Sequence, residues 1–220
     1  MSENLNVQYG AAWHAAPDWQ NFDSSPSLWL ERLPVIGSIF RMNPEPFPAA
    51  THFGDITRGL PLADGSAKAV YASHVLEHLS YDACLVALRN SYRLLKPGGV
   101  FRLIVPDLAV RVDRYVAARD AGQSDASLRF LRETLLGRES RASSPLGYLR
   151  ALIGSSDHLW MWDEASMKTA LAEAGFVDIR RCDLGDSEDP AFAAVERANR
   201  FRDEQLNVRE LGIEARRPAQ

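Results

Sequence analysis

Acidic residues and a glycine recur where the predicted strands of this chain end. Gly10 follows a strand predicted over 4–9, Asp23 ends a strand predicted over 19–23, and Asp55 ends the next one. In open α/β sheets, ligands bind beyond the carboxyl ends of the strands. A carboxylate at the second strand can accept hydrogen bonds from both ribose hydroxyls, and one at the third can accept from an adenine amino group. Each acid alone could cap a helix or a turn, but their recurrence at successive strand ends favours a nucleoside site.

Histidines and a further acid follow the later strands. Ser73 ends a predicted strand and His74 comes directly after it, whereas Asp107 follows a second buried strand and could also cap a helix. His158 lies in a loop beside Trp160, ahead of another predicted helix. An imidazole in an aromatic setting can act as a general base near neutral pH. It can equally be a packed core histidine, and the sequence leaves both interpretations open.

The residues from His74 to His78 spell HxxEH, the inverted zinc-peptidase motif. Zinc would require His74 and His78 on one face of a helix, together with a third ligand further along the chain. Here the motif straddles a strand end and a helix start, so we expect Glu77 and His78 to pack or hydrogen-bond at the helix start. We therefore assign no metal ligand, and a zinc hydrolase remains a remote alternative. His14 and His52 are expected in surface or loop positions.

Strand-like and helix-like segments alternate along the chain, which predicts a parallel α/β sheet. The helix predicted over 80–95 has Ser80 as its N-cap and an apolar face at helical spacing. The last two strands could pair in antiparallel fashion at one edge. The expected strands cover 4–9, 19–23, a segment ending at 55, 67–73, 100–105, 177–183 and 206–215. The further expected helices cover 107–121, 163–174 and 190–200, with two pieces within 124–152.

Length and composition indicate one folded domain over residues 1–220, with a proline-rich excursion at 24–51 and a helical insertion at 122–157. Hydrophobic residues make up 46% of the chain, enough for a core. Lys and Arg total 25 against 29 Asp and Glu, and this net charge of −4 argues against general nucleic-acid binding. No apolar run could span a membrane and no secretory signal is visible, so we expect a cytoplasmic protein. Cys84 and Cys182 are expected to be buried thiols.

Several segments resemble class I S-adenosylmethionine-dependent methyltransferases, especially a small bacterial branch whose first motif reads LNxGxG. They are LNVQYG (5–10), DWQNFDSSP (18–26), GDITRGLPLADGSAKAVYASHVLEHL (54–79), LLKPGGVFRLIVPDL (94–108) and HLWMWDEASMKTALAEAGFVDIRRC (158–182). The resemblance implies a Rossmann-like, mostly parallel sheet of seven strands with helices on both faces and the last strand antiparallel. Only 13 positions separate Gly10 from Asp23, so a complete first helix does not fit between them.

The same resemblance assigns roles to individual residues. It places Gly10 near the methionine part of S-adenosylmethionine, Asp23 at the ribose, Asp55 and Ile56 at the adenine, and Ser73 and His74 facing the sulfonium. The implied reaction is methyl transfer to an oxygen or nitrogen nucleophile of a small-molecule or glycan acceptor, for example a sugar hydroxyl of a surface glycan. The candidate catalytic residues are His74, Asp107 and His158.

One departure from the family pattern and one comparison with a related family keep alternatives open. The glycine-rich turn is reduced to Gln8-Tyr9-Gly10, which also allows a methyltransferase-like binding or scaffold protein without turnover. We expect the Tyr9 ring to turn outward beneath the proline-rich excursion and not into the methionine pocket. Ubiquinone-pathway O-methyltransferases, a related family, hold a divalent ion with ExxEH at the place of the HxxEH run. His74 replaces the first acid here, which weakens that reading for a hard cation.

Overall fold

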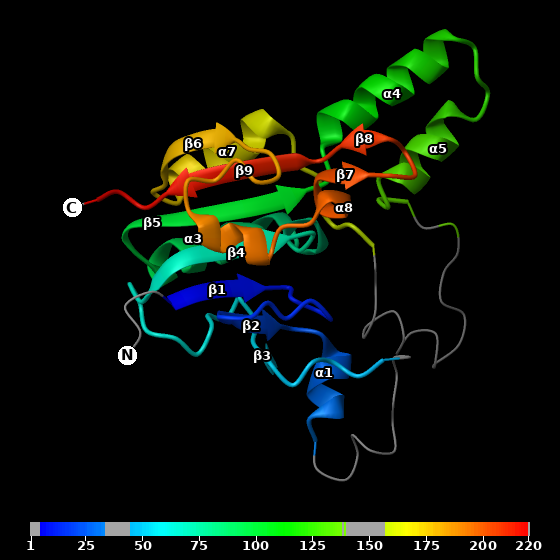
Figure 1. Ribbon diagram of the computed structural model, residues 1–220. Coiled ribbons are helices and arrows are strands. Elements are labelled where there is room, and N and C mark those ends of the chain that lie inside the picture. Colours follow the sequence, from blue (N-terminus) through cyan, green and yellow to red (C-terminus); the bar gives the residue numbers. More distant parts are fainter. Residues whose placement is uncertain (1–4, 34–44, 138, 140–156, 220) are drawn as a thin grey trace.

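The computed structural model describes residues 5–33, 45–137, 139 and 157–219 (Figure 1). Its central feature is a seven-stranded sheet with the strand order β3-β2-β1-β4-β5-β9-β6. Strands β1 to β5 run parallel, and β9 lies antiparallel between β5 and β6. The predicted sheet is thereby confirmed. The strands are β1 Leu5–Tyr9, β2 Trp19–Asp23, β3 Thr51–Phe53, β4 Ala67–Ser73, β5 Leu95–Val105, β6 Val177–Arg181 and β9 Leu211–Arg216.

The helices begin at polar caps that the sequence supplies. The side chains of Ser80, Asp107 and Asp163 each accept a hydrogen bond from a backbone N–H in the first turn of α3, α4 and α7. The second helical piece expected within 124–152 falls on residues 140–156, outside the described part. The helical elements are α1 Pro26–Glu31, η1 Leu76–His78, α3 Tyr81–Leu94, α4 Leu108–Asp120, α5 Ala126–Glu133, α7 Glu164–Glu173, η2 Pro190–Ala194 and α8 Ala198–Phe201.

The chain between β6 and β9 differs from the prediction. The helix expected over 190–200 is two short pieces, η2 and α8, and the strand expected over 206–215 begins at Leu211. A small hairpin of β7 (Arg202–Asp203) and β8 (Val208–Arg209) comes before it. Asn207 between them has φ +55°, the left-handed conformation that asparagine tolerates in turns.

Each face of the sheet has its own apolar cover. Helices α3 and α7 cover one face, where alternate strand residues such as Phe101 and Leu103 join the larger core. Residues 190–201, here called the covering segment, lie over the opposite face, in front of the sheet in Figure 1. There Phe192 packs against Trp19 and Tyr71. The link between β1 and β2 contains no helix, as expected, so a segment from late in the chain covers this face instead.

A buried arginine attaches the covering segment to the sheet. Arg102, in the middle of β5, lies on the face of the covering segment and is 1% exposed. Its guanidinium donates to Glu196 Oε1 at 2.7 Å and to Glu214 Oε2 at 2.7 Å. It also donates to Asp186 Oδ1 at 3.0 Å. These carboxylates hold the pKa of Arg102 above its usual value despite burial, which acts in the opposite direction. The charge that interrupts the apolar run of β5 is therefore neutralised within the fold.

The Tyr9 prediction is wrong. The ring lies in the larger core, 2% exposed, and its centroid is 6.4 Å from that of Phe101. Its hydroxyl lies 3.1 Å from Ser91 Oγ on α3, and burial raises the pKa of the phenol well above its usual value. Successive side chains of a strand point to opposite faces of the sheet, and the side chain of Tyr9 points to the face covered by α3. It therefore points away from the ligand position expected beyond the strand ends. Tyr9 thus occupies neither the methionine pocket nor the excursion.

Two further sequence predictions concern cysteines and membrane spans. Cys84 and Cys182 are free and buried, as expected. Within the described ranges, no helix is both long and apolar enough to cross a membrane.

Candidate functional site

Gly10 follows β1 at a point where only glycine fits. Its φ is +69°, and a Cβ atom there would collide with Cγ2 of Val75. Val75 comes two positions after the end of β4, so the ends of β1 and β4 touch at this glycine. Gly10 therefore allows the strand ends to approach each other, whatever it does for a ligand.

Asp23 uses its carboxylate to connect two loops. Oδ2 accepts a hydrogen bond from the backbone N–H of Ala12 at 2.9 Å, and Oδ1 accepts one from that of Ser25 at 2.8 Å. The residue is 8% exposed. In this conformation the acid holds the loop after β1 against the end of β2.

Asp55 and Ile56 form a turn just beyond β3, which ends at Phe53 and not at Asp55 as expected. Oδ1 of Asp55 accepts from the backbone N–H and the hydroxyl of Thr57, at 2.8 and 2.7 Å. The side chain of Ile56 belongs to the larger core, and its carbonyl accepts from Asn90 Nδ2 at 2.7 Å. A ligand could reach the acid at this turn but not the isoleucine side chain.

The space beside Gly10 is small. A cavity of about 20 Å³ lies there, room for about one water molecule, whereas small-molecule sites measure about 300–1,000 Å³. Asp23 and Asp55 do not line it, so the shared cleft implied for Gly10 and the two acids is not formed by the described residues. As positioned, this place does not admit S-adenosylmethionine. The residues around it include Gly10, His14 and Ser73 and, from the covering segment, Val195, Arg197 and Arg200.

His74 is held from both sides. Its φ is +54°, its Nε2 lies 3.0 Å from the carbonyl oxygen of Arg200, and its Nδ1 lies 3.3 Å from Glu77 Oε1. Burial alone would lower the pKa of the imidazole, but the hydrogen bond and negative charge of Glu77 outweigh it and raise the pKa. Both ring nitrogens of His74 thus already have partners, and His74 is a positioning residue in this arrangement.

Asp107 is also committed to structure. Its Oδ1 caps α4 by accepting from the backbone N–H of Ala109 at 3.1 Å, and Oδ2 accepts from Arg181 at 2.9 Å. It is 1% exposed, and a backbone bridge joins it to Trp162. The carboxylate joins α4 to β6 without facing open space.

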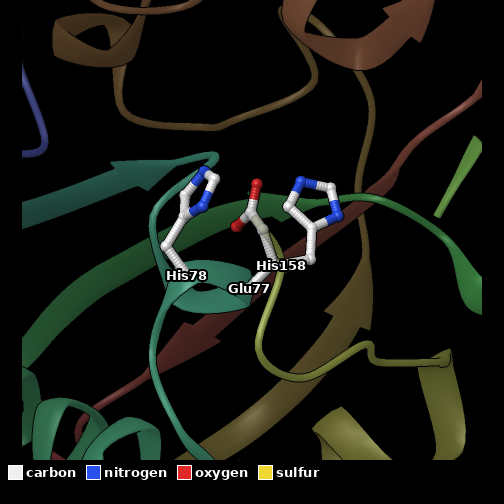
Figure 2. A group of neighbouring side chains, drawn as sticks. All are labelled: Glu77, His78 and His158. Atoms are coloured by element: carbon white, nitrogen blue, oxygen red, sulfur yellow. The ribbon is translucent and has the colours of Figure 1, made fainter. Parts of the chain in front are cut away.

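Three other side chains do converge, and we call Glu77, His78 and His158 the Glu77 cluster. Figure 2 shows the Glu77 carboxylate between the two imidazole rings. One donor atom from each residue lies within 4.8 Å of the other two, and the ring centroids are 5.1 Å apart. Apart from the contact with His74, neither carboxylate oxygen of Glu77 has a hydrogen-bond partner among the described residues, and the same holds for His158 Nδ1.

The backbone fixes the Glu77 cluster. Leu159 and Trp160 both donate their N–H groups to the Glu77 carbonyl, at 2.7 and 3.2 Å. The N–H of His158 donates to the carbonyl of Leu135 at 3.2 Å. Burial lowers the pKa of the His158 imidazole, and the charges of His78 and Arg111 act in the same direction, against the opposing effect of Glu77. Near neutral pH His158 is thus an unprotonated base beside a carboxylate.

The zinc-hydrolase geometry is not formed. His74 has a left-handed backbone conformation, and only Leu76–His78 is helical, as a single 3₁₀ turn. His74 and His78 therefore do not share one face of an α-helix, which the HxxEH motif requires. The partner of His78 is His158, far away in the sequence, and no spacing rule connects them.

Comparison with known proteins agrees with this fold. Residues 41–103 match the family described as a methyltransferase domain. No curated protein matches the chain. A SAM-dependent methyltransferase of Methanosarcina mazei has a similar structure, with a TM-score of 0.53 at 14% identity, over 100% of this chain and 95% of that one. A SAM-dependent methyltransferase of Thermotoga maritima gives 0.47 at 14% identity, over 99% and 84%.

In other matched structures, including the CurJ carbon methyltransferase, this chain spans only 50% of the solved protein. The strand order with its antiparallel β9 and the similarity to the Methanosarcina mazei structure show that the chain has the Rossmann-like fold of that protein, and the methyltransferase-domain match covers residues 41–103 of the 220.

Proposed function

We propose that the chain methylates an oxygen or nitrogen nucleophile that binds at the Glu77 cluster. The observation that carries this proposal is the position of an unprotonated His158 beside the buried carboxylate of Glu77. Among the described residues, the only partner of this carboxylate is His74, and Nδ1 of His158 has no hydrogen-bond partner. Methylation of a hydroxyl or amine requires loss of one proton, and a positioned base accepts it. Of the three candidates His74, Asp107 and His158, His158 alone has a ring nitrogen without a hydrogen-bond partner among the described residues; this Nδ1 is buried, so it would have to become accessible to the acceptor.

A sugar hydroxyl is the acceptor that the surroundings support. Trp160 and Tyr81 lie near the cluster in sequence and fold, are 44% and 41% exposed, and have ring centroids 5.0 Å apart. Aromatic faces provide large apolar contact area with a polar rim. The C–H face of a sugar ring can stack on such a pair while one hydroxyl reaches His158.

Cofactor binding requires the covering segment to move. Gly10, Asp23, Asp55, Ile56, Ser73 and His74 are the proposed cofactor residues, and the Val195–Arg200 part of the covering segment now closes the cavity. Arg197 and Arg200 lie beside the cavity. The pKa of His14 is lowered mainly by burial and further by the charges of these two arginines. Two cations at this place suit the carboxylate of a methionine group. S-adenosylmethionine would supply the methyl group as an activated sulfonium.

Calorimetry with S-adenosylmethionine and S-adenosylhomocysteine tests the cofactor. Saturable heat with either supports the enzyme. Heat and thermal shift absent with both would instead favour a methyltransferase-like binding protein without turnover, which the small cavity also suits. Transfer of a labelled methyl group to a panel of monosaccharides then tests the acceptor. His158→Gln should lower turnover by about 100-fold, the typical size of a general-base contribution, and His52→Gln on exposed β3 is the matched control.

A further inference from the structure

We propose that Glu77, His78 and His158 bind a divalent transition metal ion of the zinc type. The donor set is two imidazole nitrogens and one carboxylate oxygen, which is the protein ligand set of several catalytic zinc sites. Imidazole-rich sites select zinc, cobalt or nickel, whereas magnesium and calcium prefer oxygen ligands. The proposal is independent of methyl transfer and of cofactor binding.

The convergence of the donors supports the site. The three donor atoms lie within 4.8 Å of one another, and zinc ligands at about 2.0–2.2 Å in a tetrahedron lie ~3.4 Å apart. Side-chain rotations that move each donor atom by about 1 Å would bring the three atoms to the separation of zinc ligands. The Glu77 residue is 1% exposed, and its carboxylate is drawn between the two rings in Figure 2. Apart from the His74 ring 3.3 Å from Oε1, this buried carboxylate has no partner among the described residues, and a metal ion would supply a second one.

The residues around the cluster hold the ligands in orientation. His78 Nδ1 lies 3.1 Å from the carbonyl oxygen of Asp157, so the ring donates there and leaves Nε2 for a metal. His74 Nδ1, 3.3 Å from Glu77 Oε1, orients the carboxylate in the same way. His74 is thus an outer partner and not a ligand, which distinguishes this site from the HxxEH arrangement.

Three protein ligands leave a fourth position open for a hydroxyl or amine. A metal ion held by these residues would use a lone pair of His158 and would itself lower the pKa of a hydroxyl or amine bound at that position, so in the metal-bound state the ion, and not His158, would promote loss of the proton. Trp160, two residues after His158, is exposed at the same loop.

Cobalt titration of the metal-stripped full chain, without S-adenosylmethionine, tests the site. We expect one equivalent of Co²⁺ to give the visible absorption of a tetrahedral ion, and Zn²⁺ to abolish it by competition. Loss of an outer partner alone costs about 10- to 100-fold in metal affinity, so Glu77→Gln and His158→Gln should weaken binding by at least ~100-fold. His52→Gln should bind as the unaltered chain does.

A variant with a different metal ligand at position 158 tests the site even if Glu77→Gln and His158→Gln fail to fold. His158→Cys should retain Co²⁺ and add a thiolate-to-cobalt charge-transfer band in the near ultraviolet. The proposal is overturned if the unaltered chain shows no saturable Co²⁺ or Zn²⁺ binding, if Glu77→Gln and His158→Gln bind as tightly, if His158→Cys gives no such band, or if Mg²⁺ competes equally with Zn²⁺.

Discussion

His74 Nε2 lies 3.0 Å from the carbonyl oxygen of Arg200, and this contact joins the end of β4 to the covering segment that closes the cavity beside Gly10. Its other ring nitrogen faces Glu77. One imidazole therefore links the closed cofactor side to the Glu77 cluster.

The raised pKa of His74 makes this link depend on pH. A histidine whose pKa is higher in the folded chain than in the unfolded one stabilises the fold at low pH, and this contribution is lost as the pH rises through the folded pKa. His74→Asn removes the titration, and asparagine tolerates the positive φ. Urea unfolding should show a larger loss of stability for His74→Asn at pH 5.5 than at pH 8.5. An equal loss at both pH values would contradict the assigned shift.

Arg102 is expected to matter far more than an exposed arginine. Arg102→Met leaves Glu196 buried without its cation and leaves Glu214 with Arg180 as its remaining cation among the described residues, and breaking buried pairs in this way costs about 3–5 kcal/mol. Arg93→Met is the matched control, because its pair with Asp64 is exposed and such pairs contribute about 0–1 kcal/mol. Denaturant unfolding measures both. Similar losses in the two variants would show that the buried network does not anchor the sheet.

Gly10 and Val75 should be energetically coupled. Gly10→Ala introduces a side chain at positive φ, at a cost of about 1–2 kcal/mol, and also collides with Val75. Val75→Ala relieves the collision but not the backbone strain, so the double variant should be more stable than the sum of the single losses predicts. Thermal unfolding of the four proteins gives the coupling. Strict additivity would mean that the strand ends do not touch as described.

Tyr9 should affect stability and not ligand binding. Tyr9→Phe keeps the buried ring and loses the contact with Ser91, a change of about 0.5–1.5 kcal/mol. The affinity for S-adenosylmethionine, measured by calorimetry, should stay within about threefold of the unaltered value. A larger change would place the phenol in the binding site after all.

The limits of β2 and β4 are those predicted, because both are short and largely buried segments bounded by turn-forming residues. Ser80 also marked the start of α3 correctly. Tyr9 was not predictable, because the sequence does not say which face of β1 an aromatic ring takes. The covering segment was missed as a cover, since its partners Trp19 and Tyr71 lie more than a hundred positions earlier.

The candidate site was harder to predict than the sheet. Asp23, Asp55 and Asp107 stand where strands end, but the structure gives their oxygens to backbone N–H groups and to Arg181. The residue type and its position are the same whether a carboxylate braces a loop or binds a ligand. Only the three-dimensional partners distinguish the two uses.

The place of β9 in the sheet also determines when the fold can be completed during synthesis. β6 emerges from the ribosome before β9, yet in the described sheet it pairs with β9. Until residues 211–216 emerge, β5 has one open side and β6 lacks its neighbour, and unpaired edges of this kind invite association between chains. A nascent chain halted before residue 211 would therefore depend on chaperones more than its apolar content suggests.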